Sequence, residues 1–191
     1  MPQQHRMNPQ NSIPDSLALA PLIRIVTRQT TYWDVATDRP EAGYRIHFHG
    51  KLEFAFTETC ASPIAIHAEH PLLLEYSEPN ASIYISTKSS DPDATVSQLS
   101  SLAEHRFRGW RSLARYLNQC MPAEEILSKG HGLLLSGPRG FAEAAAQLLA
   151  SHSVNCRVLS GPLRPSNCSV LELGRNYVVA KSFRFESTQA A

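Results

Sequence analysis

Apolar and polar residues alternate along residues 44 to 57, in the pattern of a β-strand. The apolar residues keep to even positions on both sides of Gly50: Tyr44, Ile46, Phe48, Leu52, Phe54 and Phe56. Because side chains alternate between the two faces of a strand, this parity predicts one buried and one solvated face. We expect either one long strand bent at Gly50 or two strands joined by a three-residue turn at 49–51.

Shorter apolar runs on either side of this segment predict further strands. Residues 21–35 are rich in β-branched and aromatic residues, which favour a strand, and residues 63–67 offer a short one. Residues 71–76 and 82–87 flank a turn at 77–80 and predict a hairpin. The first half of the chain is therefore expected to be an antiparallel meander of short strands.

The pattern changes to a helical one after residue 87. Ser90 or Asp91 is placed to cap a helix that begins at Pro92. Apolar residues then recur every three to five positions as far as Leu117, with a kink expected at Gly109. A second, short helix is expected to follow Pro122 and to end at Gly130. The apolar positions of the first stripe are Val96, Leu99, Leu102, Phe107, Trp110, Leu113 and Leu117.

Residues 131–162 read as strand, turn, helix and strand, and the tetrapeptide Leu-Ser-Gly-Pro closes both strands. A strand-helix-strand unit makes parallel strands with a right-handed crossover. Both turns are therefore expected at the same edge of one sheet. Residues 168–173 and 177–185 then predict a hairpin with a three-residue turn at 174–176.

Together these elements predict an α+β fold. It has an N-terminal antiparallel meander, a central helical segment, and a C-terminal β-α-β unit plus hairpin, which could form one mixed sheet. Residues 1–20 are interpreted as a disordered tail, because residues 1–16 hold few large apolar side chains. Residues 21–186 are expected to form a single domain, β-rich in 21–87 and α/β in 88–186, before a frayed end at 187–191.

Charge and cysteine content narrow the classes of function. The net charge of +1 over 191 residues argues against dedicated nucleic-acid binding. No apolar run is long enough for a membrane span, and the N-terminus lacks the apolar core of a secretory signal. The four cysteines form no Cys-x-x-Cys pair. We therefore expect a soluble cytoplasmic protein with reduced thiols and no cofactor.

The two Leu-Ser-Gly-Pro turns are the candidate site for a small anionic ligand. A turn that enters a helix exposes backbone N–H groups at the positive end of the helix dipole. Open α/β sheets bind ligands at such an edge. The P-loop pattern is absent, because Pro138-Arg139 stands where Lys-Ser/Thr is required. The candidate ligand-binding residues are Ser136, Gly137, Arg139, Ser160, Gly161 and Arg164.

Residues 136–141, SGPRGF, resemble the Cys-Gly-Pro turn of ferredoxin-reductase-type nicotinamide domains, with Ser136 in place of the cysteine. No flavin-binding Arg-x-Tyr-Ser/Thr pattern precedes the segment, so no family is assigned on this likeness.

Other residues capable of chemistry form no complete motif. Whether His47, His49, His67 and His70 bind a metal stays open, because spacing places no further ligand beside them. Glu75 and Glu78 border a turn and are interpreted as solvated carboxylates. No catalytic residue is identified, so the sequence does not decide whether the protein is an enzyme.

The segment 106–116 combines arginine and aromatic residues, which are enriched at protein interfaces. Arg108, Arg111 and Arg115 stand at three-and-four spacing and would share one helix face. The first functional interpretation is therefore a non-catalytic protein that binds another protein through these arginines. The alternative is an enzyme or sensor that binds a small phosphate-containing ligand at the two turns.

Overall fold

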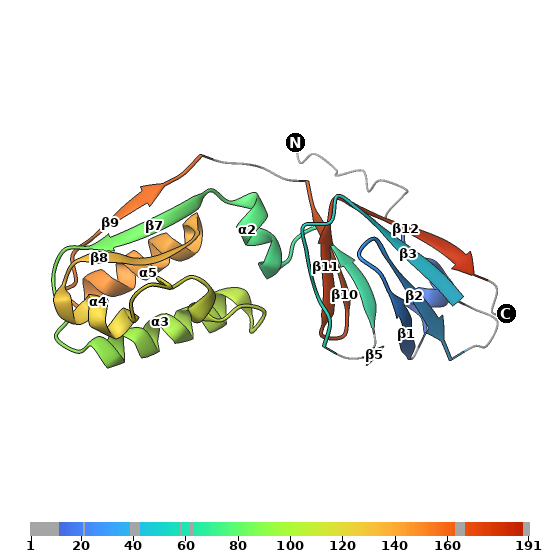
Figure 1. The fold of residues 1–191 in the computed structure, drawn as a ribbon, viewed down its shortest axis with the longest axis horizontal. Helices are drawn as coiled ribbons and strands as arrows, with labels where there is room; N and C mark the ends of the chain where they lie inside the picture. Colours follow the sequence, from blue (N-terminus) through green and yellow to red (C-terminus); the bar gives the residue numbers. More distant parts are fainter. Residues whose placement is uncertain are drawn as a thin grey trace, which may run out of the picture. The chain divides into compact units, whose positions relative to one another are not determined.

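The computed structural model describes residues 12–20, 22–38, 43–57, 59–61, 63–162 and 167–188. The chain divides into two compact units, which differs from the single domain expected for residues 21–186. The β unit comprises Met1–Leu73 and Asn167–Ala191, and the α/β unit comprises Leu74–Ser166. The α/β unit is thus inserted between the two segments of the β unit (Figure 1). The predicted α+β class is confirmed, with three antiparallel sheets in place of one mixed sheet.

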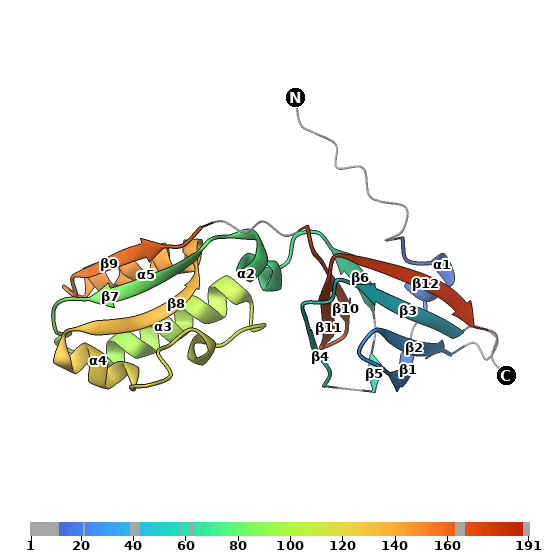
Figure 2. The same cartoon turned by 45° about the horizontal axis from the view of Figure 1, so that its top comes forward.

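The β unit contains a five-stranded sheet in the order β12-β3-β2-β1-β5. Residues 21–35, expected as one strand, contain β1 and the start of β2, separated by a turn at 29–31. Strands β3 and β5 of this sheet also come from the N-terminal segment of the unit, and β12 comes from its C-terminal segment (Figure 2). The bounds are β1 (Ile23–Arg28), β2 (Tyr32–Thr37), β3 (Gly43–His49), β5 (Cys60–Ala61) and β12 (Ser182–Thr188).

A four-stranded sheet in the order β4-β11-β10-β6 completes the β unit. Its strands are β4 (Glu53–Ala55), β6 (Ile64–His67), β10 (Ser169–Leu173) and β11 (Asn176–Ala180). The chain passes from the first sheet to the second at Gly50, whose φ is +61°. Residues 44–57 therefore form neither of the two expected arrangements. The alternation of apolar and polar residues predicts the buried face correctly in β3, where Phe48 is 6% exposed. It does not do so after Gly50, where Phe54 is 49% exposed.

The first helix described in the β unit packs against its core. Helix α1 (Asp15–Ala18) places Leu17 in the interior, fully buried among Trp33, Ile46 and Phe183. This helix lies within the tail expected to be disordered over residues 1–20. Residues 1–11 of that tail lie outside the described residues, as do 189–191 of the expected frayed end.

The hairpin of β10 and β11 has a different register from the predicted one. Leu173 pairs with Asn176 and Leu171 pairs with Val178, so a two-residue Gly174-Arg175 turn joins the strands. All five residues of β11 are buried. Because β11 has no solvent-exposed face, its sequence shows no alternation of apolar and polar residues that would define the register. The predicted register of the hairpin was therefore wrong by one residue.

The α/β unit contains a three-stranded sheet in the order β8-β7-β9. Strand β7 (Asn80–Ile85) pairs antiparallel with both β8 (Gly132–Pro138) and β9 (Cys156–Ser160). Strands β8 and β9 therefore run in the same direction, as predicted, but β7 lies between them. The hairpin expected over 71–87 is wrong, because η2 (Pro71–Leu73) and α2 (Leu74–Ser77) are helical and precede β7.

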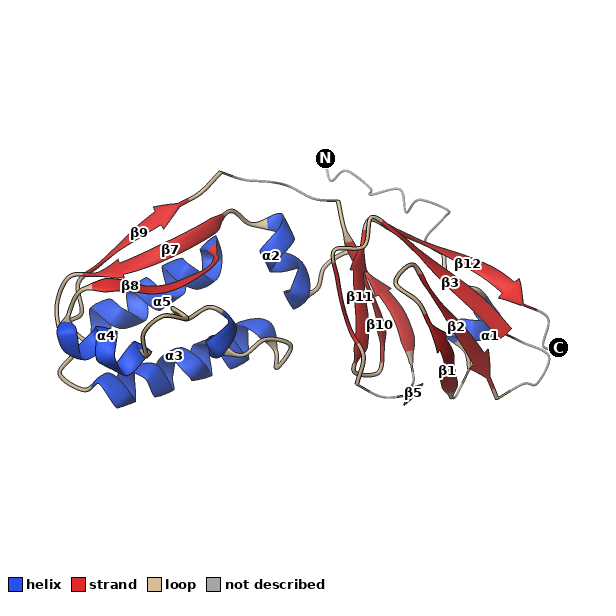
Figure 3. Cartoon of the chain, viewed as in Figure 1, coloured by secondary structure: helices blue, strands red, loops and turns tan. Residues whose placement is uncertain are grey.

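The helices of the α/β unit begin and end where local signals place them. In α3 (Pro92–Phe107), Asp91 is the cap and accepts a hydrogen bond from the backbone N–H of Ala94 at 3.0 Å. Arg108 then adopts a left-handed conformation that ends the helix, so the expected helical stripe does not continue to Leu117. Gly130 ends α4 in the same way. The remaining helical bounds are η3 (Leu113–Arg115), α4 (Ala123–Lys129) and α5 (Arg139–Ser151) (Figure 3).

These helices cover one face of the three-stranded sheet. Ala81, Ile83 and Ile85 of β7 are buried and belong to the same core as Phe107 and Phe141. Asn80, Ser82 and Tyr84 alternate with them and project from the opposite face. In the described part of the unit, helix α5 lies against this sheet on one side (Figure 1). We call the opposite side the uncovered face and define it by the following residues: Ser82, Tyr84, Ser136, Arg157 and Leu159.

No helix among the described residues is both long and apolar enough to cross a lipid bilayer.

Candidate functional site

The two Leu-Ser-Gly-Pro segments lie at one end of the three-stranded sheet. The first is the end of β8 itself, which leads directly into α5, so the turn expected there is wrong, and the second ends β9. Ser82 of β7 lies between them, opposite Ser136 on one side and Leu159 on the other. The hydroxyl oxygens of Ser82 and Ser136 are 2.7 Å apart and share a hydrogen bond. The predicted convergence of the two segments at one sheet end is therefore observed, with β7 between them.

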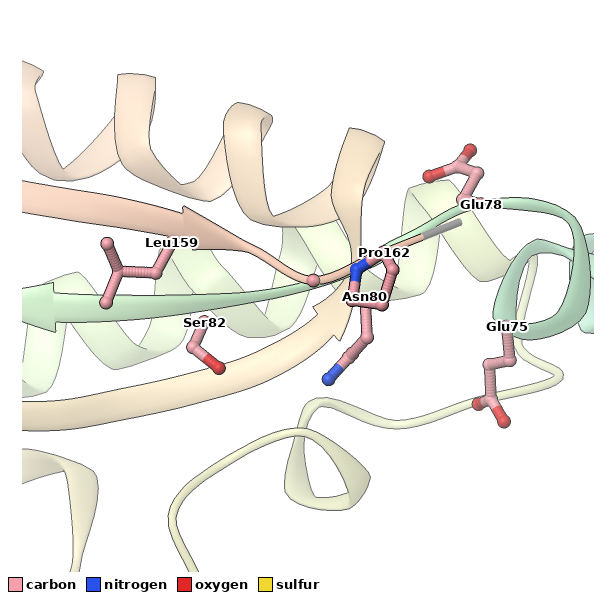
Figure 4. A pocket seen from close by; sticks show the side chains of 7 residues that line it. Glu75, Glu78, Asn80, Ser82, Leu159 and Pro162 are labelled. Carbon is pink, nitrogen blue, oxygen red and sulfur yellow. The ribbon is translucent and has the colours of Figure 1, made fainter. Parts of the chain in front are cut away.

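A shallow hollow lies at this end of the uncovered face. One part, of about 380 Å³, is lined by Glu75, Glu78, Asn80, Ser82, Leu159, Gly161 and Pro162. A second part, of about 390 Å³, shares the first three of these residues and extends to Arg115, Tyr116, Ser136, Gly137 and Pro138. Figure 4 shows Asn80 and Ser82 projecting from the strand, with Glu75 and Glu78 beyond its end. Of the predicted ligand-binding residues, Ser136, Gly137 and Gly161 thus line a concave surface.

The carboxylate of Glu78 occupies the N-terminus of α5. Its Oε2 accepts a hydrogen bond from the backbone N–H of Gly140 at 2.6 Å. Its Oε1 accepts one from Arg106 at 3.0 Å. The backbone N–H of Arg139 bonds to the carbonyl of Pro79 at 2.9 Å. The backbone N–H groups of Arg139 and Gly140, at the start of α5, are therefore satisfied by the chain itself.

Glu75 is held by three donors from the segment after α3. Its Oε1 accepts hydrogen bonds from Arg111 at 3.2 Å, Arg115 at 2.8 Å and the Tyr116 hydroxyl at 2.7 Å. Its Oε2 accepts a further one from Arg115 at 2.9 Å. The side chain of Glu75 is 16% exposed, so the interpretation of a solvated carboxylate was wrong.

These contacts shift two pKa values. Burial alone would raise the pKa of Glu75, but the hydrogen bonds from Arg115 and Tyr116 and the charges of Arg111 and Arg115 lower it below its usual range. Burial and the hydrogen bond to Glu75 raise the pKa of Tyr116. Glu75 therefore stays ionised and Tyr116 stays protonated at neutral pH, and neither is poised to exchange a proton.

The other predicted anion-binding residues are more loosely placed. Arg139 forms an ion pair with Glu143, one helical turn later, at 2.6 Å. Ser160 and Gly161 are exposed at the end of β9. Arg164 lies outside the described residues. The structure thus brings Ser136, Gly137, Ser160 and Gly161 to one sheet end but engages the side chain of Arg139 with Glu143.

The three predicted partner-binding arginines do not share a helix face. Arg108 ends α3 and is exposed, whereas Arg111 is 8% exposed and Arg115 follows in η3. Arg111 and Arg115 converge on Glu75. The spacing argument failed because it assumed that α3 continues beyond Phe107.

Three of the four histidines whose role the sequence left open, His47, His67 and His70, lie beside carboxylates. His47 lies 3.1 Å from Glu186, and His67 and His70 lie 3.1 and 3.5 Å from the same oxygen of Glu172. The backbone N–H of Leu72 donates to Nδ1 of His70 at 3.2 Å, so in neutral His70 the proton is on Nε2, facing Glu172. Among the described residues, no group of three or more His, Cys, Asp or Glu could hold a metal ion.

Sequence reasoning missed the residues that shape the hollow from outside the two turns: Glu75, Glu78, Asn80, Ser82 and Tyr116. One signal was present. The segment 106–116 carries four arginines, and Glu75 and Glu78 are acidic residues earlier in the chain that could compensate them.

The sequence matches no known protein family, and comparisons with curated proteins and with solved structures gave no significant match.

Proposed function

We propose that this chain is a non-catalytic binding protein whose α/β unit recognises another protein through the uncovered face. The observation that carries the proposal is the one-sided cover of the three-stranded sheet. Helices bury the inner face, whereas Tyr84 and Leu159 project from the other with 42% and 43% of their surface exposed. Apolar side chains gathered on an open sheet face are typical of a surface that binds a partner.

The state of the charged groups supports a binding role over catalysis. Glu75 and Glu78 each form ion pairs with arginine, so both carboxylates are engaged within the chain. The Tyr116 hydroxyl donates to Glu75. The contacts of Glu75 and Glu78 hold α2 and the residue after it against the rest of the unit and shape the hollow. Their role is therefore structural.

We propose a cytoplasmic location for this binding protein. Cys120 and Cys156 carry free thiols, which persist in a reducing compartment. Burial raises the pKa of the Cys156 thiol, so this cysteine is a weak nucleophile.

Site-specific photo-crosslinking tests the proposal. A photoreactive residue at Tyr84, in cells that express the full chain, should yield a discrete adduct with another protein. The same group at Gln147, an exposed position on the outer side of α5, is the matched control and should yield none. The substitution Leu159→Glu should abolish the Tyr84 adduct. Equal labelling from both positions would contradict the proposal.

A second candidate function is binding of a small anionic ligand at the two turns. The observation that favours it is the hollow of about 380 Å³ lined by Ser82 and Gly161. A thermal-shift screen with nucleotides and phosphorylated metabolites tests it. Stabilisation that is lost when Arg139→Ala and Arg164→Ala are combined would support this candidate, and stabilisation that persists in the double variant would contradict it.

A further inference from the structure

The outer edge of β9 carries unpaired backbone groups in a regular pattern. The N–H of Gly161 bonds to the carbonyl of Asn80 at 2.7 Å, and the N–H of Ser86 bonds to the carbonyl of Asn155 at 2.8 Å. In an antiparallel pair, directly opposed residues alternate between bonded and non-bonded pairs. Arg157 and Leu159 therefore bond to β7. The N–H and C=O groups that point outward belong to Cys156, Val158 and Ser160.

At the opposite edge of the same sheet, the outward backbone groups are bonded within the chain. There the N–H of Ser136 bonds to the carbonyl of Tyr116 at 2.8 Å, and the N–H of Asn118 bonds to the carbonyl of Leu134 at 3.0 Å. The chain thus caps the outward groups of β8 with its own segment 116–118. In the described part of the unit, no segment does the same for β9.

Strand β9 carries one charged side chain at its edge, Arg157, but lacks the proline, lysine and bulge that often protect an open edge. Its sequence, Cys-Arg-Val-Leu-Ser, contains no proline or lysine, and it pairs with β7 along its whole length without a bulge. Cys156 and Val158 face the core side, and Arg157 and Leu159 belong to the uncovered face. Such an edge offers a template for one more strand.

The charge of Arg157, beside this edge, indicates which kind of partner strand would fit. Arg157 is exposed and makes no ion pair or hydrogen bond with the described residues. It stands two residues from the exposed Leu159, so both side chains lie on the same face of the strand. A strand that places a carboxylate beside Arg157 and an apolar side chain beside Leu159 would complement both.

We infer that β9 binds an extended segment of another protein by strand addition, and that this segment carries an acidic residue two positions from an apolar one. The inference rests on the proposed function and names the mode of binding and the partner chemistry. Main-chain hydrogen bonds to Val158 and its outward neighbours supply affinity. Contacts with Arg157 and Leu159 supply specificity.

The test uses linear peptides selected from a displayed random library on the full chain, then synthesised and titrated by fluorescence anisotropy. Val158→Pro removes the central outward N–H, and Val158→Ala, which shortens the side chain but keeps that N–H, is the matched control. Proline is tolerated on edge strands, since the lost donor is not used within the sheet. Peptides should bind the alanine variant like the native chain and the proline variant at least about tenfold more weakly.

Further variants keep the test decisive if Val158→Pro unfolds the chain. Ser160→Pro and Ser160→Ala repeat the comparison at an exposed position with the same outward orientation. Arg157→Glu should weaken peptides that carry an acidic residue about tenfold, as expected for loss of a close charge pair. Failure to enrich any peptide, or equal binding to the proline and alanine variants, would overturn strand addition. A Tyr84 photo-adduct that persists in the proline variants would leave the proposed function standing.

Discussion

The carboxylate of Glu78 and the backbone N–H of Gly140 are joined by a 2.6 Å hydrogen bond at the first turn of α5. Gly140 fits this contact because it has no side chain: a Cβ there would approach Arg106 to 2.7 Å and Glu78 to 3.1 Å. A carboxylate at this position satisfies a free helix N–H and interacts favourably with the helix dipole. The chain therefore fills its own anion-binding position with a side chain 62 residues earlier in the sequence.

Replacing this carboxylate should lower stability. We expect Glu78→Ala to cost about 1–2 kcal/mol of unfolding free energy, because it removes hydrogen bonds to Gly140 and Arg106 and leaves a helix N–H unpaired. Urea denaturation of the two proteins measures the difference. Glu143→Ala is the control, since its exposed pair with Arg139 should contribute less than about 0.5 kcal/mol. A cost no larger than that of the control would show that the Glu78 contact contributes little.

Glu75 should make stability depend on pH in the acidic range. Its folded-state pKa lies below the ordinary value of 4.5, so the folded chain holds its proton less tightly than the unfolded chain does. The contribution of Glu75 is thus fully present above that ordinary value and is lost as pH falls through the folded pKa. The free energy of unfolding of the native chain should therefore converge on that of Glu75→Gln as the solution is acidified.

At neutral pH, Glu75→Gln should be less stable by about 2 kcal/mol, because it leaves Arg111 and Arg115 without their carboxylate. Urea denaturation of both proteins between neutral and acidic pH measures the convergence. The matched control is Glu125→Gln, which removes only an exposed pair with Lys129 and should differ little from the native chain at any pH. A difference between native and Glu75→Gln that stays constant on acidification would contradict this account.

A glycine that ends a helix should be sensitive to substitution where space is short. Gly130 has φ +74°, and a Cβ there would lie 2.5 Å from the backbone nitrogen of Lys88. Gly109 has nearly the same φ, +77°, but its Cβ would meet only the side chain of Glu104, at 3.2 Å. We expect Gly109→Ala to lower the free energy of unfolding by about 1 kcal/mol, from backbone strain alone. Gly130→Ala should lower it by at least about 2 kcal/mol, because the close approach to Lys88 adds to the strain. Thermal denaturation should separate the two, and equal costs would argue against the close approach to Lys88.

The parts of the fold that the sequence predicted are those with strong local signals. Asp91 caps α3 and Gly130 ends α4, because each position requires a side chain or a φ angle that few residues supply. The strand, helix and strand that begin with β8 were also predicted, and the common direction of the two strands followed from the helix that connects them. Residues 71–76 were assigned wrongly to a strand, since a short apolar run fits either structure.

The pairing of distant segments could not be predicted. Strand β7 lies between β8 and β9 although more than 40 residues separate it from the nearer one, and no local pattern encodes that choice. The same limit applies to the candidate site. The sequence placed the two Leu-Ser-Gly-Pro segments at one sheet end, but the carboxylates of Glu75 and Glu78 reach this end only through contacts of long sequence separation.

The α/β unit should fold when residues 74–166 are expressed alone. Its core cluster, centred on Phe107, Phe141 and Leu135, shares no residue with the core cluster around Trp33 in the β unit. A unit with its own hydrophobic core can fold independently, and its chain is continuous. We expect cooperative thermal unfolding and protection of the β7 amides from hydrogen exchange. Fast exchange of those amides in the isolated segment, together with protection in the full chain, would show that the core of the α/β unit is insufficient by itself.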